Sequence, residues 1–251
     1  MLIVGRKPVL EALKSHLQVK KVIHLLNIQS KPLQEIFYYA DERNIPIEAM
    51  NKKDFQSSVK GEFDHSQGIA AIVEEFRYSE LDDIFVRARD KKEKPFIVIL
   101  DEIEDPHNLG ALIRTAECAG AHGIILPKHH SAPITPVVMK TSAGAAAHLP
   151  IVEVTNIVNT IEELKKSNVW IVGTDVHAPT LYYNVDYTDS IAIVIGNEGR
   201  GVRRLVLEHC DFVVTIPMMG ELDSLNASVA GGVLLFEVVR ARYLKNRGIS
   251  F

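Results

Sequence analysis

Three segments in the second half of the chain combine small residues with polar side chains and could therefore hold a ligand. They are Asp105–Gly110 with Arg114 after it, Gly196–Gly201 (GNEGRG), and Pro217–Ser228 with Ser224 and Asn226 near its end. Glycines allow a main chain to approach a bound group closely. An arginine suits a phosphate or a hydroxyl that is losing its proton. The three segments together predict a ligand held by main-chain groups, with an arginine nearby.

Arg114 follows Asn108 by six residues, within a pattern of apolar residues that predicts a helix beginning near Asn108, which could cap it. An arginine buried in such a pattern is costly unless it has an anionic partner. Two interpretations stay open at this point. Arg114 pairs with Glu117 or Asp101, or it is aimed at a substrate.

The glycine-rich hexamer Gly196–Gly201 has the spacing G-x-x-G-x-G. A dinucleotide site needs G-x-G-x-x-G early in a first strand–helix–strand unit, and a P-loop needs a closing Lys-Ser/Thr pair. Because the spacing of its glycines fits neither motif, the sequence argues against an NAD-dependent oxidoreductase. The hexamer is either a tight turn or part of a ligand site.

The last segment follows a β-branched strand, Phe212–Ile216, which Pro217 ends. Ser224 and Asn226 stand where helix N-caps are expected, and Ala227 opens a helix that runs almost to Arg247. Gly231 and Gly232 each cost this helix about 1 kcal/mol relative to alanine. Close packing against the sheet or a ligand must compensate for that cost.

Metal and hydrolase chemistry are not indicated. The histidines have no zinc-ligand spacing, the chain has no paired cysteines, and Ser224 lacks the G-x-S-x-G elbow of a serine hydrolase. We expect no metal site.

Composition indicates an ordinary soluble protein. The 251 residues are 47% hydrophobic and 24% charged, which is enough for a good core in one or two domains. Two cysteines in apolar patterns suggest buried thiols in a reducing compartment. We expect a cytoplasmic location, because no secretion signal or membrane-spanning run is visible. A net charge of −4 argues against non-specific nucleic-acid binding, whereas local basic clusters that include Arg6, Lys7, Arg200 and Arg203 suit a selective polyanion site.

Residues 95–251 alternate between apolar strands and helices, which predicts an α/β fold with a mostly parallel sheet covered on both faces. The expected strands are Phe96–Leu100, Gly123–Leu126, Ile151–Val154, Val169–Gly173, Ile191–Ile195 and Phe212–Ile216, and the expected helices are Asn108–Ala119, Val137–Ala143, Ile157–Lys166 and Ala227–Arg247. Ligands of such sheets bind at the carboxyl ends of the strands. The loops after Leu100, Gly173, Ile195 and Ile216 should therefore share one rim.

Residues 1–77 alternate in the same way and predict a small α/β/α domain. The expected helices are Gly5–Leu17, Leu33–Arg43 and Asn51–Val59, and the expected strands are Val22–Leu26, Ile45–Met50 and Ile69–Val73. Residues 78–94 are dense in charge and predict a linker helix that ends in a solvated hinge. We place the domain boundary there.

The three polar segments, taken in order, resemble the three motifs of the SpoU/TrmH (SPOUT) family of RNA ribose 2′-O-methyltransferases. Asp105–Gly110 through Ala116 resembles the first motif, Ile195–Gly201 the second, and Ile216–Met218 with Ser224–Ala230 the third. The leading domain, with Gly5–Val9 and His65–Gly68, is similar to L30e-like RNA-binding domains. This pairing of domains is typical of the 23S ribosomal RNA guanosine-2′-O-methyltransferases.

The resemblance implies a C-terminal trefoil knot, a homodimer, ribosomal RNA as partner and S-adenosylmethionine as cofactor. It places the cofactor at Thr174, Gly196, Ile216 and Leu225. It implies that Arg114 acts at the ribose hydroxyl, with Asn108, Glu198, Ser224 and Asn226 orienting the arginine and the ribose. Alternatives are a tRNA ribose, an rRNA adenosine, or an RNA-binding ribosome-assembly factor without turnover.

Overall fold

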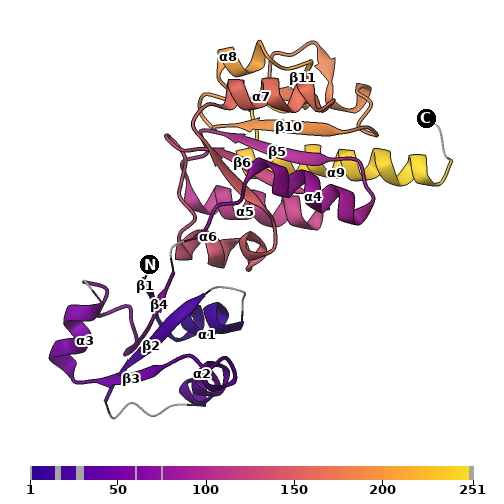
Figure 1. The fold of residues 1–251 in the computed structure, drawn as a ribbon. Coiled ribbons are helices and arrows are strands. Elements are labelled where there is room, and N and C mark those ends of the chain that lie inside the picture. The colour runs from indigo at the N-terminus through magenta and orange to yellow at the C-terminus, as the bar shows by residue number, and fades with distance from the viewer. Residues whose placement is uncertain (1, 15–17, 27–30, 60, 75, 249–251) are drawn as a thin grey trace. The chain divides into compact units, whose positions relative to one another are not determined.

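The computed structural model describes residues 2–14, 18–26, 31–59, 61–74 and 76–248, and these form two units (Figure 1). The first unit comprises Met1–Arg77 with Ile134–Lys140, and the second comprises Tyr78–Pro133 with Thr141–Phe251. The predicted end of the first helix, at Leu17, lies outside the described residues.

The first unit is a mixed four-stranded sheet between two layers of helices, as the alternating pattern predicted. The strand order is β1-β4-β2-β3, with β2 and β3 parallel and the other pairs antiparallel. Its elements are β1 (Leu2–Val4), α1 (Arg6–Lys14), β2 (Val19–Leu25), α2 (Lys31–Glu42), β3 (Ile47–Met50), α3 (Lys52–Ser58) and β4 (Ile69–Val73). Asn51 caps α3 by accepting a hydrogen bond from the Asp54 amide at 3.0 Å. Pro46 precedes β3, an edge strand.

The second unit is built on a seven-stranded sheet whose strand pairs are all parallel, in the order β7-β6-β5-β10-β8-β11-β9. Its strands are β5 (Phe96–Asp101), β6 (Gly123–Pro127), β7 (Ile151–Val154), β8 (Trp170–Thr174), β9 (Thr180–Leu181), β10 (Ile191–Gly196) and β11 (Phe212–Thr215). Every residue of β5, β6 and β10 is buried, as continuous apolar runs in a doubly covered sheet require.

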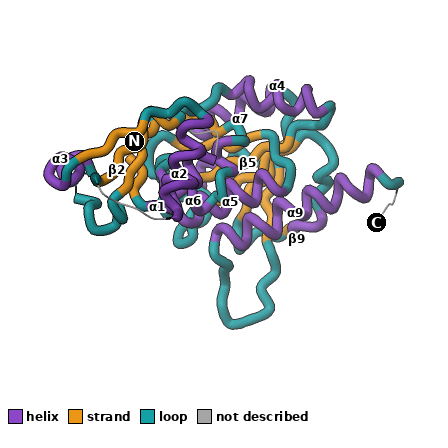
Figure 2. Tube along the Cα trace, turned by 90° about the horizontal axis from the view of Figure 1, so that it is seen from below, coloured by secondary structure: helices purple, strands orange, loops and turns teal. Residues whose placement is uncertain are grey.

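Helices cover both faces of this sheet. They are α4 (Leu81–Lys91), α5 (Pro106–Cys118), α7 (Ile157–Lys166), α8 (Arg204–Leu207) and α9 (Ala227–Asn246). Residues of α4, α7 and α8 share one apolar core with the sheet, while α5 and α9 pack against each other (Figures 1 and 2). The short helix α6 (Pro136–Thr141) begins within the segment that groups with the first unit.

Residues 78–94 are more firmly packed than a linker would be. Ile84 of α4 is fully buried in the core of the second unit. A Cβ on Gly123 would lie 2.4 Å from the Ile84 Cγ1, so β6 needs glycine at the point where α4 crosses it. The predicted helix is thus present as α4, and Lys91–Lys94, where the solvated hinge was predicted, are exposed.

One local expectation was wrong, and another holds only in part. Asp105, rather than Asn108, caps α5, because its carboxylate accepts a hydrogen bond from the His107 amide at 2.7 Å and Pro106 occupies the first helical position. Cys118 is exposed, so the expectation of two buried thiols holds only in part: Cys210 is partly buried, and burial raises the pKa of its thiol to about 12.

Candidate functional site

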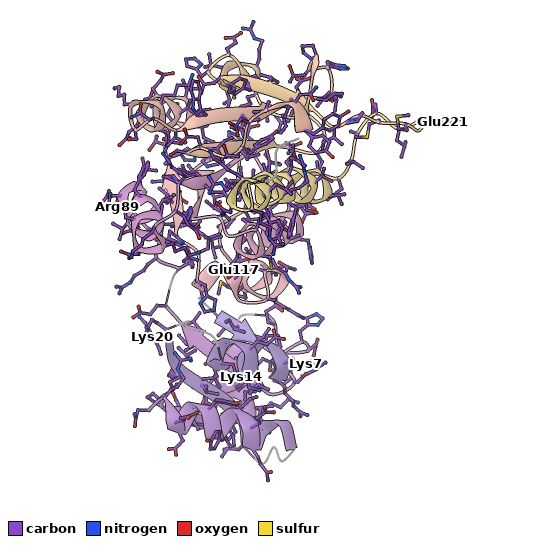
Figure 3. All side chains as sticks on the ribbon, turned by 90° about the vertical axis from the view of Figure 1, so that its right-hand side faces the viewer. Lys7, Lys14, Lys20, Arg89, Glu117 and Glu221 are labelled. Atoms are coloured by element: carbon purple, nitrogen blue, oxygen red, sulfur yellow. The ribbon has the colours of Figure 1, made fainter. Side chains whose placement is uncertain are left out.

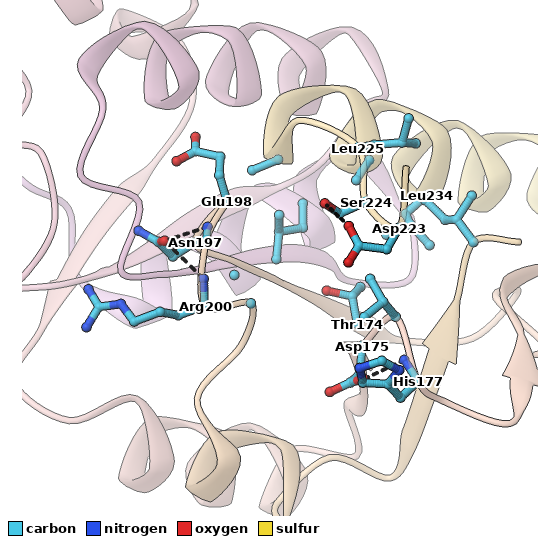
Figure 4. A pocket seen from close by; sticks show the side chains of 18 of the residues that line it. Thr174, Asp175, His177, Asn197, Glu198, Arg200, Asp223, Ser224, Leu225 and Leu234 are labelled. Carbon is cyan, nitrogen blue, oxygen red and sulfur yellow. Dashed lines mark hydrogen bonds between the residues drawn. The ribbon is translucent and has the colours of Figure 1, made fainter. Parts of the chain in front are cut away.

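A cavity of about 410 Å³ lies at the carboxyl ends of β8, β10 and β11 (Figure 4). This volume falls in the range of about 300–1,000 Å³ that small-molecule sites occupy. All four residues predicted to hold a cofactor line the cavity: Thr174, Gly196, Ile216 and Leu225. Of the four loops predicted to share a rim, those after Gly173, Ile195 and Ile216 line the cavity, and the loop after Leu100 does not.

The loop after β10 forms one wall of the cavity and is very tightly closed. Asn197 and Gly201 exchange two main-chain hydrogen bonds, of 3.1 and 2.8 Å. A Cβ on Gly196 would lie 2.2 Å from main-chain atoms of Gly201 and Val202, so no larger residue fits there. Gly201 itself has a φ of +67°, a conformation that favours glycine.

The Asn197 side chain holds this turn from inside. Its Oδ1 accepts hydrogen bonds from the amides of Gly199 at 2.9 Å and Arg200 at 3.4 Å, and its Nδ2 donates to the Glu102 carbonyl at 3.0 Å. The hexamer is thus a tight turn and a wall of the cavity at once, so the two interpretations of its sequence are compatible.

The opposite wall comes from the ends of β8 and β11. The Thr174 hydroxyl donates to the Val194 carbonyl at 3.1 Å, which joins β8 to β10 at the rim. Asp175, Asp223 and Ser224 also line the cavity, and the Ser224 hydroxyl donates to Asp223 at 3.2 Å (Figure 4). The two aspartates were not singled out in the sequence, although Asp175 lies two residues after the end of the predicted strand Val169–Gly173.

Three of the predicted catalytic residues form one hydrogen-bonded chain beside the cavity. The Asn226 Nδ2 donates to the Asn108 Oδ1 at 3.1 Å, and the Asn108 Nδ2 donates to the Glu198 Oε1. The Asn226 Oδ1 also accepts from the Ser228 amide at 3.0 Å and so caps α9, as predicted. One side chain from each of the three motifs therefore meets here, although the motifs lie far apart in sequence.

Arg114 does not join this chain. Its side chain is exposed, it is not among the residues that line the cavity, and within the described residues it has no ion pair with Glu117 or Asp101. Helix geometry explains this position, because Arg114 lies roughly 200° around α5 from Leu112, which faces α9. Of the two interpretations of Arg114, the pairing with Glu117 or Asp101 is therefore not found among the described residues, and its aim at a substrate stays a prediction.

Two of the four predicted RNA-binding residues have acidic partners. The Arg203 guanidinium donates to Asp101 at 2.6 and 2.9 Å, and Arg200 lies 3.6 Å from both Glu102 and Glu104. Hydrogen bonding to Asp101 raises the pKa of Arg203 above its ordinary value.

The other two residues belong to the first unit. The Arg6 main-chain amide, at the start of α1, donates to the Gln67 side chain at 3.3 Å. Lys7 is exposed on the same helix (Figure 3).

The paired glycines of α9 have different surroundings. A Cβ on Gly231 would lie 2.4 Å from the Leu112 Cδ2 and 3.0 Å from the Ile195 Cδ1, which explains why the helix accepts the cost of a glycine. A Cβ on Gly232 would meet only Thr115, at 3.9 Å. Close packing thus accounts for Gly231 but not for Gly232.

Within the described part of the chain, no cluster of three or more histidine, cysteine or carboxylate side chains could hold a metal ion. No helix among the described residues has the length and apolar character needed to cross a bilayer.

Comparison with known proteins decides the family. Residues 95–236 match the model of the SpoU rRNA methylase family, and residues 2–79 match the family described as RNA 2′-O ribose methyltransferase substrate binding. The chain belongs to the SpoU rRNA methylase family. Its predicted membership of the SpoU/TrmH group, its fold class and its class as an RNA methyltransferase that uses S-adenosylmethionine are thereby confirmed.

Individual members of the family are similar over nearly the whole chain. YacO of Bacillus subtilis (strain 168), named for the TrmH family of tRNA/rRNA methyltransferases, is 43% identical over 240 residues, which cover 96% of this chain and 95% of YacO. The solved SpoU methyltransferase AviRb from Streptomyces viridochromogenes, in complex with AdoMet, superposes with a TM-score of 0.76 at 28% identity, covering 97% of this chain and 90% of AviRb. An AdoMet-bound rRNA methyltransferase from Sinorhizobium meliloti has a TM-score of 0.73 at 28% identity, with 95% and 86% covered.

Proposed function

We propose that this SpoU family member transfers a methyl group from S-adenosylmethionine to a ribose 2′-hydroxyl of structured RNA, and that the target is a guanosine of 23S ribosomal RNA. The observation that carries the proposal is the hydrogen-bonded chain Asn226–Asn108–Glu198 beside a cavity walled by main-chain loops. This arrangement supports the proposal, because it offers a cavity for the donor and polar side chains for a hydroxyl at one rim.

The residues that line the cavity fit the methyl donor. Ile216, Leu225 and Leu234 offer apolar surface for a flat ring, and the closed turn after Gly196 presents main-chain groups to polar edges. Asp175 and Asp223 are suited to the positive charge of a sulfonium and an amino group. When bound, the donor supplies an electrophilic methyl group.

The side chains of the protein would position the ribose and assist the loss of its proton. Asn108 and Glu198 are held by each other and by Asn226, so their remaining polar atoms are preorganised for a hydroxyl group. Arg114 has no partner among the described residues and is free to hold the phosphate of the target. A guanidinium stays protonated at neutral pH and is a poor base, so Arg114 stabilises the developing alkoxide while water takes the proton.

The position of Arg114 supports a homodimer in which each cavity receives this arginine from the other subunit. The outer face of α9 carries Val229, Phe236 and Tyr243 at seven-residue spacing, each about half exposed (52%, 49% and 53%). Met219, 95% exposed, lies on the loop whose tip at Glu221 projects away from the second unit (Figure 3). The trefoil knot, like the homodimer, stays a prediction from the resemblance.

Mixing inactive variants tests the shared site. Arg114→Ala and Gly196→Ala should each be inactive alone, and co-refolding them should restore up to about a quarter of parental activity per subunit, because one mixed-dimer site is intact. No recovery, with mixed dimers shown by tagged purification, would place both residues in one subunit's site.

The reaction itself is tested by tritium transfer from labelled S-adenosylmethionine to 23S rRNA, 16S rRNA and bulk tRNA. Transfer to 23S rRNA alone supports the proposal, and mapping the nucleotide in rRNA from a deletion strain identifies the base. Transfer to tRNA, or modification of an adenosine, would select one of the alternatives. RNA binding without any transfer would indicate an assembly factor.

Single-turnover methylation by Arg114→Lys tests the arginine. Since lysine keeps the charge but loses the planar fork, we expect the rate to fall by roughly tenfold to a hundredfold. Arg89→Lys, in an exposed pair with Asp82, is the matched control and should be unchanged. An Arg114→Lys rate within a few fold of the parent would remove Arg114 from the chemistry.

A further inference from the structure

Asp101, the last residue of β5, has a fully buried carboxylate that binds one residue at three points. Its Oδ2 accepts the Arg203 main-chain amide at 2.9 Å, and its Oδ1 accepts the Arg203 Nε at 2.9 Å and Nη2 at 2.6 Å. A buried carboxylate needs such pairing to remain charged. The two residues are 102 positions apart in sequence, so the pair ties distant segments together.

The segment that this pair closes is the wall of the cavity. Gly196 lies beside Asp101 in the β5–β10 register, the chain then makes the turn Asn197–Gly201, and at Arg203 it returns to the same carboxylate. Asn197 adds a third link between the turn and the end of β5, because its Nδ2 donates a hydrogen bond to the Glu102 carbonyl at 3.0 Å. Glu198, near the tip of the turn, bonds to Asn108. The position of Glu198 and of the wall therefore depends on where the turn is anchored.

These contacts give Arg203 a different task from RNA binding. Its Nε and Nη2 are committed to Asp101, and its Nη1 lies 3.6 Å from Glu102. A guanidinium surrounded by two carboxylates has little net positive charge to offer a phosphate.

We propose that Arg203 is a positioning residue that clamps the turn Asn197–Gly201 to the end of β5 and so shapes the cavity for S-adenosylmethionine. The clamp acts through the main chain of the turn and through Glu198, without contact between Arg203 and the substrate. This inference rests on the proposed function for the identity of the ligand, while the clamp itself concerns only residues of this chain.

The test uses the full-length chain with Arg203→Lys, which keeps the charge but cannot make the forked contact with Asp101. Calorimetry with S-adenosylmethionine should show a Kd raised roughly tenfold or more. Hydrogen exchange without the donor should be faster at the amides of Gly199, Arg200 and Gly201. Filter binding of a 23S rRNA transcript should give a Kd within about twofold of the parent, with an unchanged salt dependence.

Arg89→Lys, in its exposed pair with Asp82, is the matched control and should alter none of the three measurements. Asp101→Asn keeps the size of the other partner and removes its charge, so it should reproduce the same pattern and decides the matter if Arg203→Lys does not fold.

Unchanged donor affinity with unchanged exchange would overturn the clamp. Weaker RNA binding with unchanged donor affinity would also overturn it and return Arg203 to the RNA. If the parent itself binds no S-adenosylmethionine, the proposed function fails, while the exchange measurement still reports on the clamp.

Discussion

The seven parallel strands of the second unit end in two edges that use their polar groups differently. At the carboxyl edge, loops that contain glycines surround a cavity, and the carboxylates of Asp175, Glu198 and Asp223 line it. At the amino edge, polar side chains form hydrogen bonds to the main chain of the protein. The Arg242 guanidinium donates to the carbonyls of Lys94, Pro95 and Asp189 at 2.8–3.0 Å, across the entrances of β5 and β10.

His122 shows the same behaviour at the amino edge. Its Nδ1 accepts a hydrogen bond from the Phe96 amide at 2.9 Å, so its proton lies on Nε2, which faces Glu93 at 3.1 Å. Burial lowers the pKa of His122 to about 4. The difference between the edges teaches that the amino end contributes mainly to stability, whereas the carboxyl end also holds the cavity. The predictions below test this difference.

The largest effect is expected from Gly196→Ala at the carboxyl edge. The new methyl group would overlap main-chain atoms of the turn, which cannot move aside as a side chain could. Overpacking of about 3 kcal/mol or more should weaken S-adenosylmethionine binding by ~100-fold or more, measured by calorimetry. Gly199→Ala is the matched control in the same turn, since its Cβ would meet only the Asn197 Oδ1, at 3.6 Å, and affinity should be kept.

Arg242→Met should have the opposite signature at the amino edge. Loss of charged hydrogen bonds to three carbonyls should lower the free energy of unfolding by about 3 kcal/mol, measured by urea denaturation. Donor affinity, measured well below the melting temperature, should stay within about twofold. Arg247→Met removes an exposed arginine of the same helical end and should cost less than about 0.5 kcal/mol. A loss of donor affinity in Arg242→Met would mean that the two edges are coupled.

The buried His122 predicts a pH dependence of stability. Its folded pKa, about 4, lies below the ordinary value of 6.5, so the unfolded chain binds this proton more readily. The stability is fully present above pH 6.5 and is lost as the pH falls towards 4. Between pH 7 and 4.5 this amounts to about 2 kcal/mol. His122→Gln should flatten the slope, whereas the exposed His129→Gln should not, and equal slopes for all three proteins would contradict the assignment.

The smallest effect is expected from Asn226→Ser. Serine also caps a helix well, so stability should change by less than about 0.5 kcal/mol. The hydrogen bond to Asn108 is lost, and single-turnover methylation should slow by roughly fivefold to tenfold. Asn156→Ser provides the comparison, because the Asn156 Oδ1 caps α7 by accepting a hydrogen bond from the Asn159 amide. Equal rates for the two variants would exclude Asn226 from the positioning of Asn108.

The sequence predicts the layers of this fold well, because burial on both faces leaves an unmistakable apolar run. The strand Ile69–Val73 and the helix Ile157–Lys166 have the predicted bounds. β9 and α8 were missed because two and four residues are too few to show a period. β1 was missed as well, since three residues at the chain start carry little signal.

Local motifs predicted which loops line the cavity, but they did not predict the partners of the arginines. Gly196 and Leu225 line the cavity because each belongs to a loop at a strand end, which the alternation of elements reveals. The partners of the arginines depend on contacts across the fold. Arg114 is exposed because α9 covers a different face of α5, and Arg203 faces a carboxylate from a distant strand end. No local pattern distinguishes such a partner from a phosphate.

The closed path from Gly196 back to Asp101 also restricts how this protein can evolve. Six residues lie between Gly196, which neighbours Asp101 in the sheet, and Arg203, which binds the Asp101 carboxylate. Side chains on this path can be exchanged wherever they face solvent, but an inserted or deleted residue would shift Arg203 out of reach. Natural relatives that keep the arginine and the aspartate should therefore differ here in composition and agree in length.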